Sequence, residues 1–251
     1  MGSNPQPTVQ KAGLLPTELL GQSASLFKLF RKQQYPCTRT GTNCLKQAIT
    51  KIYSQVMEMD PATGTENLDP MFLDIIEGKL SVVQYELTDT TVKGLKKCEI
   101  ENVKLSPELV LHIDLICPRI SIYGNYNING KVAMIPIKGN GDFRIETKKF
   151  QIKLDMQLKK TIFEDGQTYI AVKDFKQTAE PLERMKFNFK NLFNGKNELL
   201  SDILHTYANT HWKEFSKEIH DPVLDATLQK VIKNINLCFK KISITQFTPV
   251  L

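Results

Sequence analysis

Residues 198–242, ELLSDILHTYANTHWKEFSKEIHDPVLDATLQKVIKNINLCFKKI, decide the fold. Apolar side chains recur in this stretch at the three-to-four-residue spacing of one helix face. The stripe consists of Leu200, Leu204, Tyr207, His211, Phe215, Ile219, Leu224, Leu228, Val231, Ile235, Cys238 and Ile242. A continuous helix of this length would extend for about 65 Å, far beyond the usual helix of about 11–12 residues. We expect Pro222 to bend it, because proline removes a backbone donor and clashes with the preceding turn.

The preceding block, residues 71–190, has the two-residue period of β-strands. Apolar side chains occupy every second position in 109–115 and in 150–158, and polar residues fill most positions between them. Turn signals stand at Asn129-Gly130, at residues 139–142 (GNGD) and at residues 164–166 (EDG). No helical period interrupts the strands, so the block predicts a long antiparallel meander.

A helix this long cannot bury its stripe in a small core, and the meander has an apolar face that also needs cover. The simplest solution is an α+β fold in which a highly curved antiparallel sheet wraps the long C-terminal helix. Two N-terminal helices are expected, over residues 17–34 and 44–59. We expect residues 1–16 to form a flexible arm and residues 17–251 to form a single domain. Space left between helix and sheet would be a long apolar tunnel for an extended ligand.

Composition excludes several classes of protein. The chain has 251 residues, a net charge of +6 and 41% hydrophobic residues, which is typical of a globular protein. No window of about 18 apolar residues predicts a membrane span. The basic residues are interspersed, so nucleic acid is not an expected partner. Gly139-x-Gly141 lacks the third glycine of a dinucleotide loop, no cluster has zinc spacing, and no nucleophile–base motif occurs, so we expect no enzyme activity, metal or cofactor.

The five cysteines indicate a disulfide and leave one pairing open. Cys37 and Cys44 enclose a short polar loop that can bring their Cβ atoms within bonding range. Cys98 and Cys117 lie symmetrically about the turn at residues 106–108, so they are either a second disulfide or two buried thiols. Cys238 is left over and is expected to pack on a helix.

Candidate ligand contacts are aromatic, methionine and histidine side chains in or near the expected lining. Amphipathic rings can orient a polar ligand head, while methionine adapts to a flexible chain; ordinary core packing is the alternative for each of them. The candidates are Tyr123, Tyr126, Met134, Phe143, Met156, Phe189, Phe193, Tyr207, His211 and Trp212.

Short motifs in order along the chain give a resemblance to a known family. They are Cys37-x6-Cys44-Leu45, residues 68–70 (LDP), 92–95 (VKGL), 118–120 (PRI), 123–131 (YGNYNINGK), 135–141 (IPIKGNG), 191–195 (NLFNG) and 209–212 (NTHW). Together they resemble the insect takeout and juvenile hormone binding protein family. The resemblance implies a secreted carrier of a hydrophobic small molecule, with a helix inside a wrapped sheet and a Cys37–Cys44 disulfide. Terpenoid, fatty acyl, quinone and carotenoid ligands all remain open.

Two functional hypotheses follow. The first is an extracellular, non-enzymatic carrier, whose signal peptide lies outside this numbering. The second is an interaction module with a filled interior, in which the amphipathic stretch 17–34 docks on a membrane or a protein. Either hypothesis allows a transient membrane or receptor contact, and neither fixes the oligomeric state.

Overall fold

The computed structural model describes residues 42–80, 83–132, 135–162 and 166–240. Its helices are α2 (Thr42–Val56), α3 (Glu198–Thr210) and α4 (Trp212–Phe239). The expected helix over 44–59 is therefore confirmed as α2. The expected arm 1–16 and the expected helix over 17–34 lie outside the described residues, so the domain boundaries and the interaction-module hypothesis stay predictions.

Within the described segments, nine strands form two antiparallel sheets. They are β1 (Met71–Leu80), β2 (Val83–Lys93), β3 (Glu99–Leu105), β4 (Val110–Cys117), β5 (Ile120–Val132), β6 (Ile135–Thr147), β7 (Phe150–Ile162), β8 (Thr168–Pro181) and β9 (Lys186–Phe189). One sheet has the order β1-β2-β5-β6-β9 and the other has the order β3-β4-β7-β8. Successive hairpins thus alternate between the two sheets, whereas the sequence had suggested one continuous sheet.

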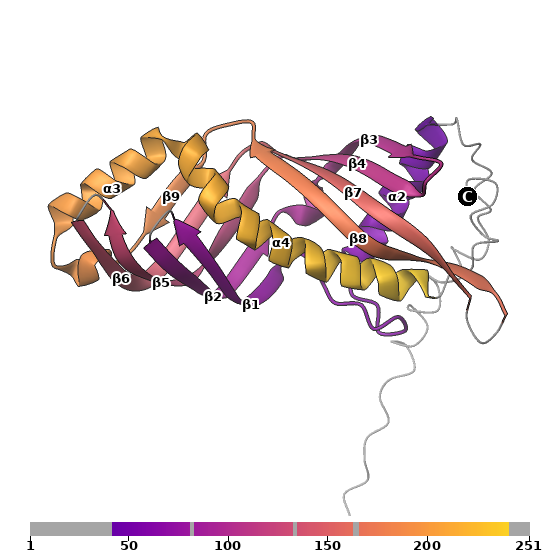
Figure 1. Ribbon diagram of the computed structural model, residues 1–251, viewed down its shortest axis with the longest axis horizontal. Helices are drawn as coiled ribbons and strands as arrows, with labels where there is room; N and C mark the ends of the chain where they lie inside the picture. Colours follow the sequence, from indigo (N-terminus) through magenta and orange to yellow (C-terminus); the bar gives the residue numbers. More distant parts are fainter. Residues whose placement is uncertain (1–41, 81–82, 133–134, 163–165, 241–251) are drawn as a thin grey trace, which may run out of the picture. The chain divides into compact units, whose positions relative to one another are not determined.

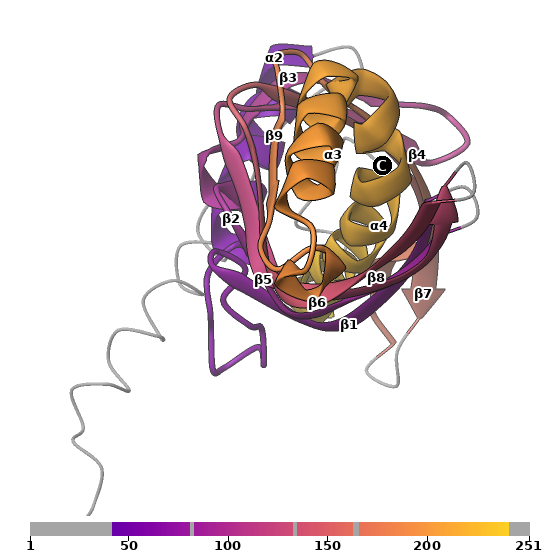
Figure 2. The ribbon, with the colours of Figure 1, turned by 90° about the vertical axis from the view of Figure 1, so that its left-hand side faces the viewer.

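Helix α4 runs along both sheets (Figure 1). Seen end-on, the strands of the five-stranded sheet curve around α3 and α4 (Figure 2). The Lys230 ammonium donates to the Phe72 carbonyl of β1 at 2.7 Å, and the Asn236 side chain binds both the N–H and the C=O of Val172 on β8 at 2.8 and 3.2 Å. The long C-terminal helical segment wrapped by curved antiparallel strands is confirmed.

The helical segment breaks at His211, which the sequence did not indicate, and it stays helical through Pro222. At the break, the carbonyl of Asn209 accepts hydrogen bonds from Nε and Nη2 of Arg184, at 3.1 and 2.8 Å. At Pro222, the missing N–H would have bonded to the carbonyl of Glu218, four residues earlier. The Tyr85 hydroxyl of β2 donates to that carbonyl at 2.9 Å. Side chains from distant segments therefore satisfy the free carbonyls at both the proline and the break.

Replacing Tyr85 with phenylalanine should lower the free energy of unfolding by about 1–3 kcal/mol, because the Glu218 carbonyl would lose its partner. Urea unfolding followed by circular dichroism measures this. Combining the change with Pro222→Ala supplies a backbone N–H to the same carbonyl, so the penalty of Tyr85→Phe should shrink in that background. Equal penalties in both backgrounds would refute the pairing of Tyr85 with the proline site.

Two of the expected turns lie inside strands. Asn129-Gly130 belongs to β5, and residues 139–142 belong to β6. A Cβ on Gly141 would lie 2.4 Å from the carbonyl oxygen of Lys190, so this glycine admits a close backbone approach rather than a reversal. The third signal is confirmed, since Gly166 has φ +71° between β7 and β8.

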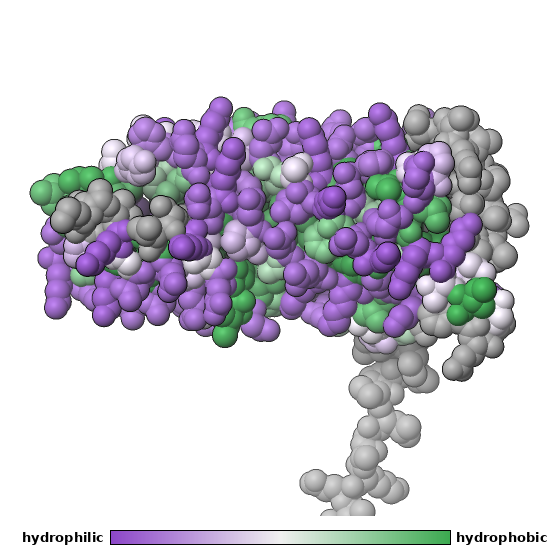
Figure 3. All heavy atoms as spheres, viewed as in Figure 1, coloured by the Kyte–Doolittle hydropathy of each residue, from purple (hydrophilic) through white to green (hydrophobic). Residues whose placement is uncertain are grey.

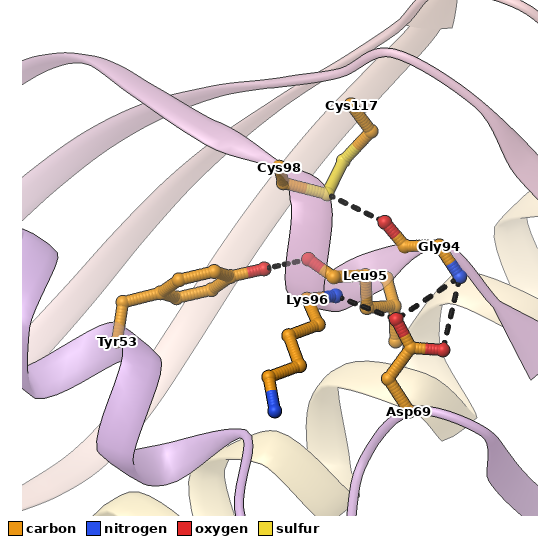
Figure 4. The surroundings of a disulfide bond; sticks show 7 residues. All are labelled: Tyr53, Asp69, Gly94, Leu95, Lys96, Cys98 and Cys117. Atoms are coloured by element: carbon orange, nitrogen blue, oxygen red, sulfur yellow. Dashed lines mark hydrogen bonds between the residues drawn. A yellow bond between two sulfur atoms is a disulfide. The ribbon is translucent and has the colours of Figure 1, made fainter.

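Cys98 and Cys117 form a disulfide, which resolves the alternative left open by the sequence (Figure 4). Glu99 pairs with Ile116 in the β3–β4 ladder, so the next positions outward bring the two cysteines together. Cys44 is also disulfide-bonded, and its expected partner, Cys37, lies outside the described residues. Cys238 is a free thiol on α4, and burial raises its pKa to about 11.

Beside this disulfide, two motifs of the family resemblance meet (Figure 4). The Asp69 carboxylate accepts from the N–H of Gly94 at 3.1 Å and from the N–H of Lys96 at 2.8 Å. Gly94 has φ +107°, and a Cβ there would lie 2.0 Å from the Arg119 carbonyl, so only glycine fits. The Tyr53 hydroxyl of α2 donates to the Leu95 carbonyl at 2.5 Å. These motifs hold the entry to the sheets together, and Val92 and Leu95 of the second motif also line the smaller cavity described below.

Candidate functional site

An apolar cavity of about 140 Å³ lies beneath α3, between that helix, the start of α4 and the five-stranded sheet. It is lined by Val83, Tyr85, Leu87, Tyr126, Ile128, Ile137, Phe189, Leu192, Leu204, His205, Tyr207, Ala208, Phe215 and Ile219. An apolar cavity of about 150 Å³ stays dry and holds one benzene molecule. This cavity therefore accepts a ring or a short chain segment without rearrangement.

Helix α3 forms one wall of the cavity and is fastened to β9 by side chains. The Asn209 amide accepts from the N–H of Phe187 and donates to its C=O, both at 2.9 Å. The N–H of Phe189 donates to Nε2 of His205 at 3.0 Å. Leu199 and Ile203 of α3 are more than half exposed, and so is Tyr207, which also lines the cavity. Apolar atoms accordingly gather at the surface over this end of the protein (Figure 3).

The hydroxyls of Tyr85 and Tyr126 and the imidazole of His205 in the cavity wall already have partners. Because a backbone N–H can only donate, His205 must accept at Nε2, and its Nδ1–H then donates to the Ser201 carbonyl at 2.8 Å. The Tyr126 hydroxyl donates to the Lys190 carbonyl at 2.8 Å, and burial raises its pKa to about 12. The cavity therefore offers apolar surface and little hydrogen bonding, which suits a hydrocarbon group.

A second apolar cavity, of about 30 Å³, lies farther along α4. It is lined by Val92, Leu95, Ile120, Ile122, Ile145, Thr147, Phe150, Ile152, Met185, His220, Val223, Leu224 and Thr227. The two cavities have no lining residue in common, where the sequence had suggested one long tunnel. On β9, Phe187 lies between Met185 of the second cavity and Phe189 of the first, and its ring packs edge-on against Phe215 at 4.9 Å. Phe187 therefore stands at the boundary.

His220 is the buried ionisable group of the second cavity, with 5% of its surface exposed. Its Nδ1 lies 2.6 Å from the Asp221 carboxylate, and its ring meets Phe150 edge-on at 5.7 Å. Lys217 and Asp221 of α4, Lys153 of β7 and Glu180 of β8 line the solvent-facing pocket on its other side. Burial outweighs the attraction of Asp221 and lowers the pKa of His220.

Acidification should consequently destabilise the protein through His220. Above the unfolded-state pKa of about 6.5, the imidazole is neutral in both states and contributes nothing. Below this pH, the imidazole binds a proton in the unfolded chain but stays neutral in the folded protein, where its pKa is lower. The free energy of unfolding therefore decreases as the pH is lowered. Unfolding free energies measured at several pH values between 7.5 and 5 should fall less steeply for His220→Asn. Identical slopes would contradict this role for His220.

The structure brings together three of the ten predicted ligand contacts: Tyr126, Phe189 and Tyr207 all line the larger cavity. Phe143 is buried behind that wall, its ring stacked on Phe189 at 6.3 Å. Met134 lies outside the described residues. Ligand contact by these residues stays a prediction.

The other five predicted contacts do not line either cavity. Tyr123 lies on the outer face of β5, near the Lys93 ammonium at 5.3 Å, because its parity along the strand is opposite to that of Tyr126. Met156 is buried on β7 in the other sheet, and Phe193 is half-buried in the short helix η2 (Phe193–Gly195). His211 is exposed and Trp212 half-buried at the α3–α4 junction, where the helix break interrupts the expected stripe.

Sequence reasoning missed Tyr85, His205 and His220. The strand parity of Val83, Tyr85 and Leu87 was a usable signal for the first. His205 could have been found because it neighbours Leu204 and lies three residues before Ala208 on the inner face of α3. His220 carried no such signal, because its burial depends on Phe150 and on the path of α4.

Among the described residues, no helix is long and apolar enough to cross a membrane. Nor does any group of three or more histidine, cysteine, aspartate or glutamate side chains in those segments have an arrangement that could hold a metal ion.

Comparison with known proteins gives consistent matches. The family model described as haemolymph juvenile hormone binding protein matches residues 19–249. The circadian clock-controlled protein daywake of Drosophila melanogaster is 25% identical over 154 residues, which cover 61% of this chain; its Drosophila yakuba counterpart is 25% identical over 150 residues, or 60%. The chain spans only 56% and 55% of the length of these relatives. Takeout 1 of Epiphyas postvittana has the same fold, with a TM-score of 0.77, 28% identity and coverage of 84% of this chain and 98% of its own.

Proposed function

Because the chain belongs to the insect takeout and haemolymph juvenile hormone binding protein family, we propose that it carries a hydrophobic small molecule in the cavity beneath α3. The observation that supports this most directly is the apolar wall of that cavity, whose few polar atoms are already hydrogen-bonded. Family membership agrees with it, since this is a family of carriers rather than of enzymes.

The driving force is removal of apolar surface from water. At about 25 cal/mol per Å², burying ~300 Å² of ligand contributes roughly 7 kcal/mol before the costs of ordering, which corresponds to a micromolar-class Kd. Terpenoid, fatty acyl, quinone and carotenoid molecules all supply such surface. The cavity of about 140 Å³ holds only part of a ligand of this kind. We therefore propose that α3 moves away from the sheet when an extended ligand enters, while its hydrogen bonds to β9 are kept.

We also propose that the protein acts outside the cell. The Cys98–Cys117 disulfide supports this location, because disulfides persist in oxidising compartments. No cofactor is proposed, and the hydrophobic molecule is the expected partner.

Organic extraction of the purified protein, followed by mass spectrometry, tests the proposal. We expect an apolar molecule at close to one equivalent, and competitive displacement of an apolar fluorescent probe by hydrocarbons added afterwards. Repeated failure to extract any ligand, together with no probe binding by the extracted protein, would refute the carrier function.

A further inference from the structure

Two buried polar side chains of the second cavity each have an atom without a hydrogen-bond partner among the described residues. They are His220 on α4 and Thr147 on β6, which are 5% and 3% exposed. Both line the cavity of about 30 Å³. The hydroxyl of Thr147 and Nε2 of His220 are unpaired, whereas Nδ1 of His220 faces the Asp221 carboxylate at 2.6 Å.

Buried polar atoms without a hydrogen-bond partner lower the stability of the folded state, because they have lost their hydrogen bonds to water, and native proteins keep few such groups. Thr227 lines the same cavity but donates to the Val223 carbonyl at 2.7 Å, so its hydroxyl is satisfied. The unpaired atoms of Thr147 and His220 therefore mark a place that a ligand atom can complete.

Their chemistry specifies what that atom is. The nearby Asp221 carboxylate favours the proton on Nδ1 of His220, which leaves Nε2 as a hydrogen-bond acceptor. The Thr147 hydroxyl can donate. A hydroxyl can donate to Nε2 while it accepts from Thr147, and it is the group of this kind that a mainly hydrocarbon ligand carries, whereas an ether or ester oxygen could only accept.

The second cavity is also placed to receive the end of a longer molecule. Ile219 lines the larger cavity and the next residue, His220, lines the smaller one. Phe187 lies between Met185 and Phe189 along the chain, and its ring packs against Phe215 of the larger cavity at 4.9 Å. We propose that His220 and Thr147 bind the terminal hydroxyl of an extended ligand whose apolar chain occupies the cavity beneath α3. This inference rests on the proposed carrier function and adds a ligand class to it.

Competitive displacement of an apolar fluorescent probe tests the inference with three ligands of equal chain length: a primary alcohol, its methyl ether and the alkane. The native protein should bind the alcohol about ten-fold more tightly than the other two, the worth of one to two buried hydrogen bonds. Thr147→Val removes the hydroxyl without changing the shape, so it should abolish most of this preference and leave alkane binding unchanged. Thr227→Val, in the same cavity, is the matched control and should keep the preference.

The outcomes separate this inference from the carrier function. Equal affinity for alcohol and alkane, or a full alcohol preference in Thr147→Val, overturns the hydroxyl site and leaves the carrier proposal standing. Failure of the native protein to bind any of the three ligands overturns both. The comparison of the three ligands on the native protein needs no variant, so poor folding of Thr147→Val would not remove the test.

Discussion

Replacing Ala208 with phenylalanine should raise the Kd for an apolar fluorescent probe at least ten-fold, and should leave the folded state intact. Ala208 is 4% exposed on the inner face of α3 and lines the larger cavity. A cavity of about 150 Å³ holds one benzene molecule, so the added phenyl ring would occupy most of the space of about 140 Å³. The ligand could then enter the cavity only by displacing the phenyl ring of the substituted residue.

Thr206→Phe is the matched control for this change. Thr206 is exposed on the same helix, so the variant adds the same ring to the outer face. Probe titration and thermal unfolding should show near-native affinity for this control. Both variants should unfold at temperatures close to that of the native protein, because the cavity accepts the ring without overpacking. Unchanged probe affinity in Ala208→Phe would place the ligand elsewhere.

Replacing Asn234 with leucine should lower the free energy of unfolding by about 3–5 kcal/mol, the range for breaking a buried polar network. Asn234 is 1% exposed on α4. Its amide donates to the carbonyls of Val56 and Glu66 at 3.1 and 2.8 Å, and it accepts from the N–H of Glu66 at 3.2 Å. Leucine has a similar volume but leaves these backbone groups without a partner, so α4 would lose its attachment to the end of α2.

Lys233→Ala provides the comparison for Asn234→Leu. Lys233 also contacts Glu66, through an exposed ion pair of 2.8 Å, and exposed pairs contribute about 0–1 kcal/mol. Urea unfolding should therefore show a large loss of unfolding free energy for Asn234→Leu and a small one for Lys233→Ala. A cost for Asn234→Leu no greater than that for Lys233→Ala would show that the buried network does not stabilise the fold.

The elements that follow from local periodicity were predictable from the sequence. The stripe from Leu200 to Ile235 predicted helix, and alternation in 109–115 and 150–158 predicted β4 and β7. The symmetry of Cys98 and Cys117 about one turn predicted their register. Division of the strands into two sheets was not predictable, because it depends on which hairpins pair across long stretches of chain.

Prediction of the site was weaker, for a physical reason. Tyr126 and Phe189 could be found because strand parity places them inward, and the same parity argues against Tyr123. The exposure of His211 follows from a helix break that Arg184 stabilises by taking the Asn209 carbonyl. Contacts between residues far apart in sequence leave no local period, so neither that break nor the burial of His220 could be read in advance.

The alternation of hairpins between sheets has a consequence for how the chain reaches its native state. Cys117 of β4 pairs with Phe150 of β7, so the whole β5–β6 hairpin lies between these two strands in the sequence. Similarly, β6 pairs with β9, whose residues follow their partners by 40 to 46 positions. Pairings of such long sequence separation form slowly, because loop-closure entropy is lost before contacts compensate for it. On a ribosome, the nascent chain would expose unpaired strand edges until its last third had emerged, so its yield in cells should depend on chaperones that shield those edges.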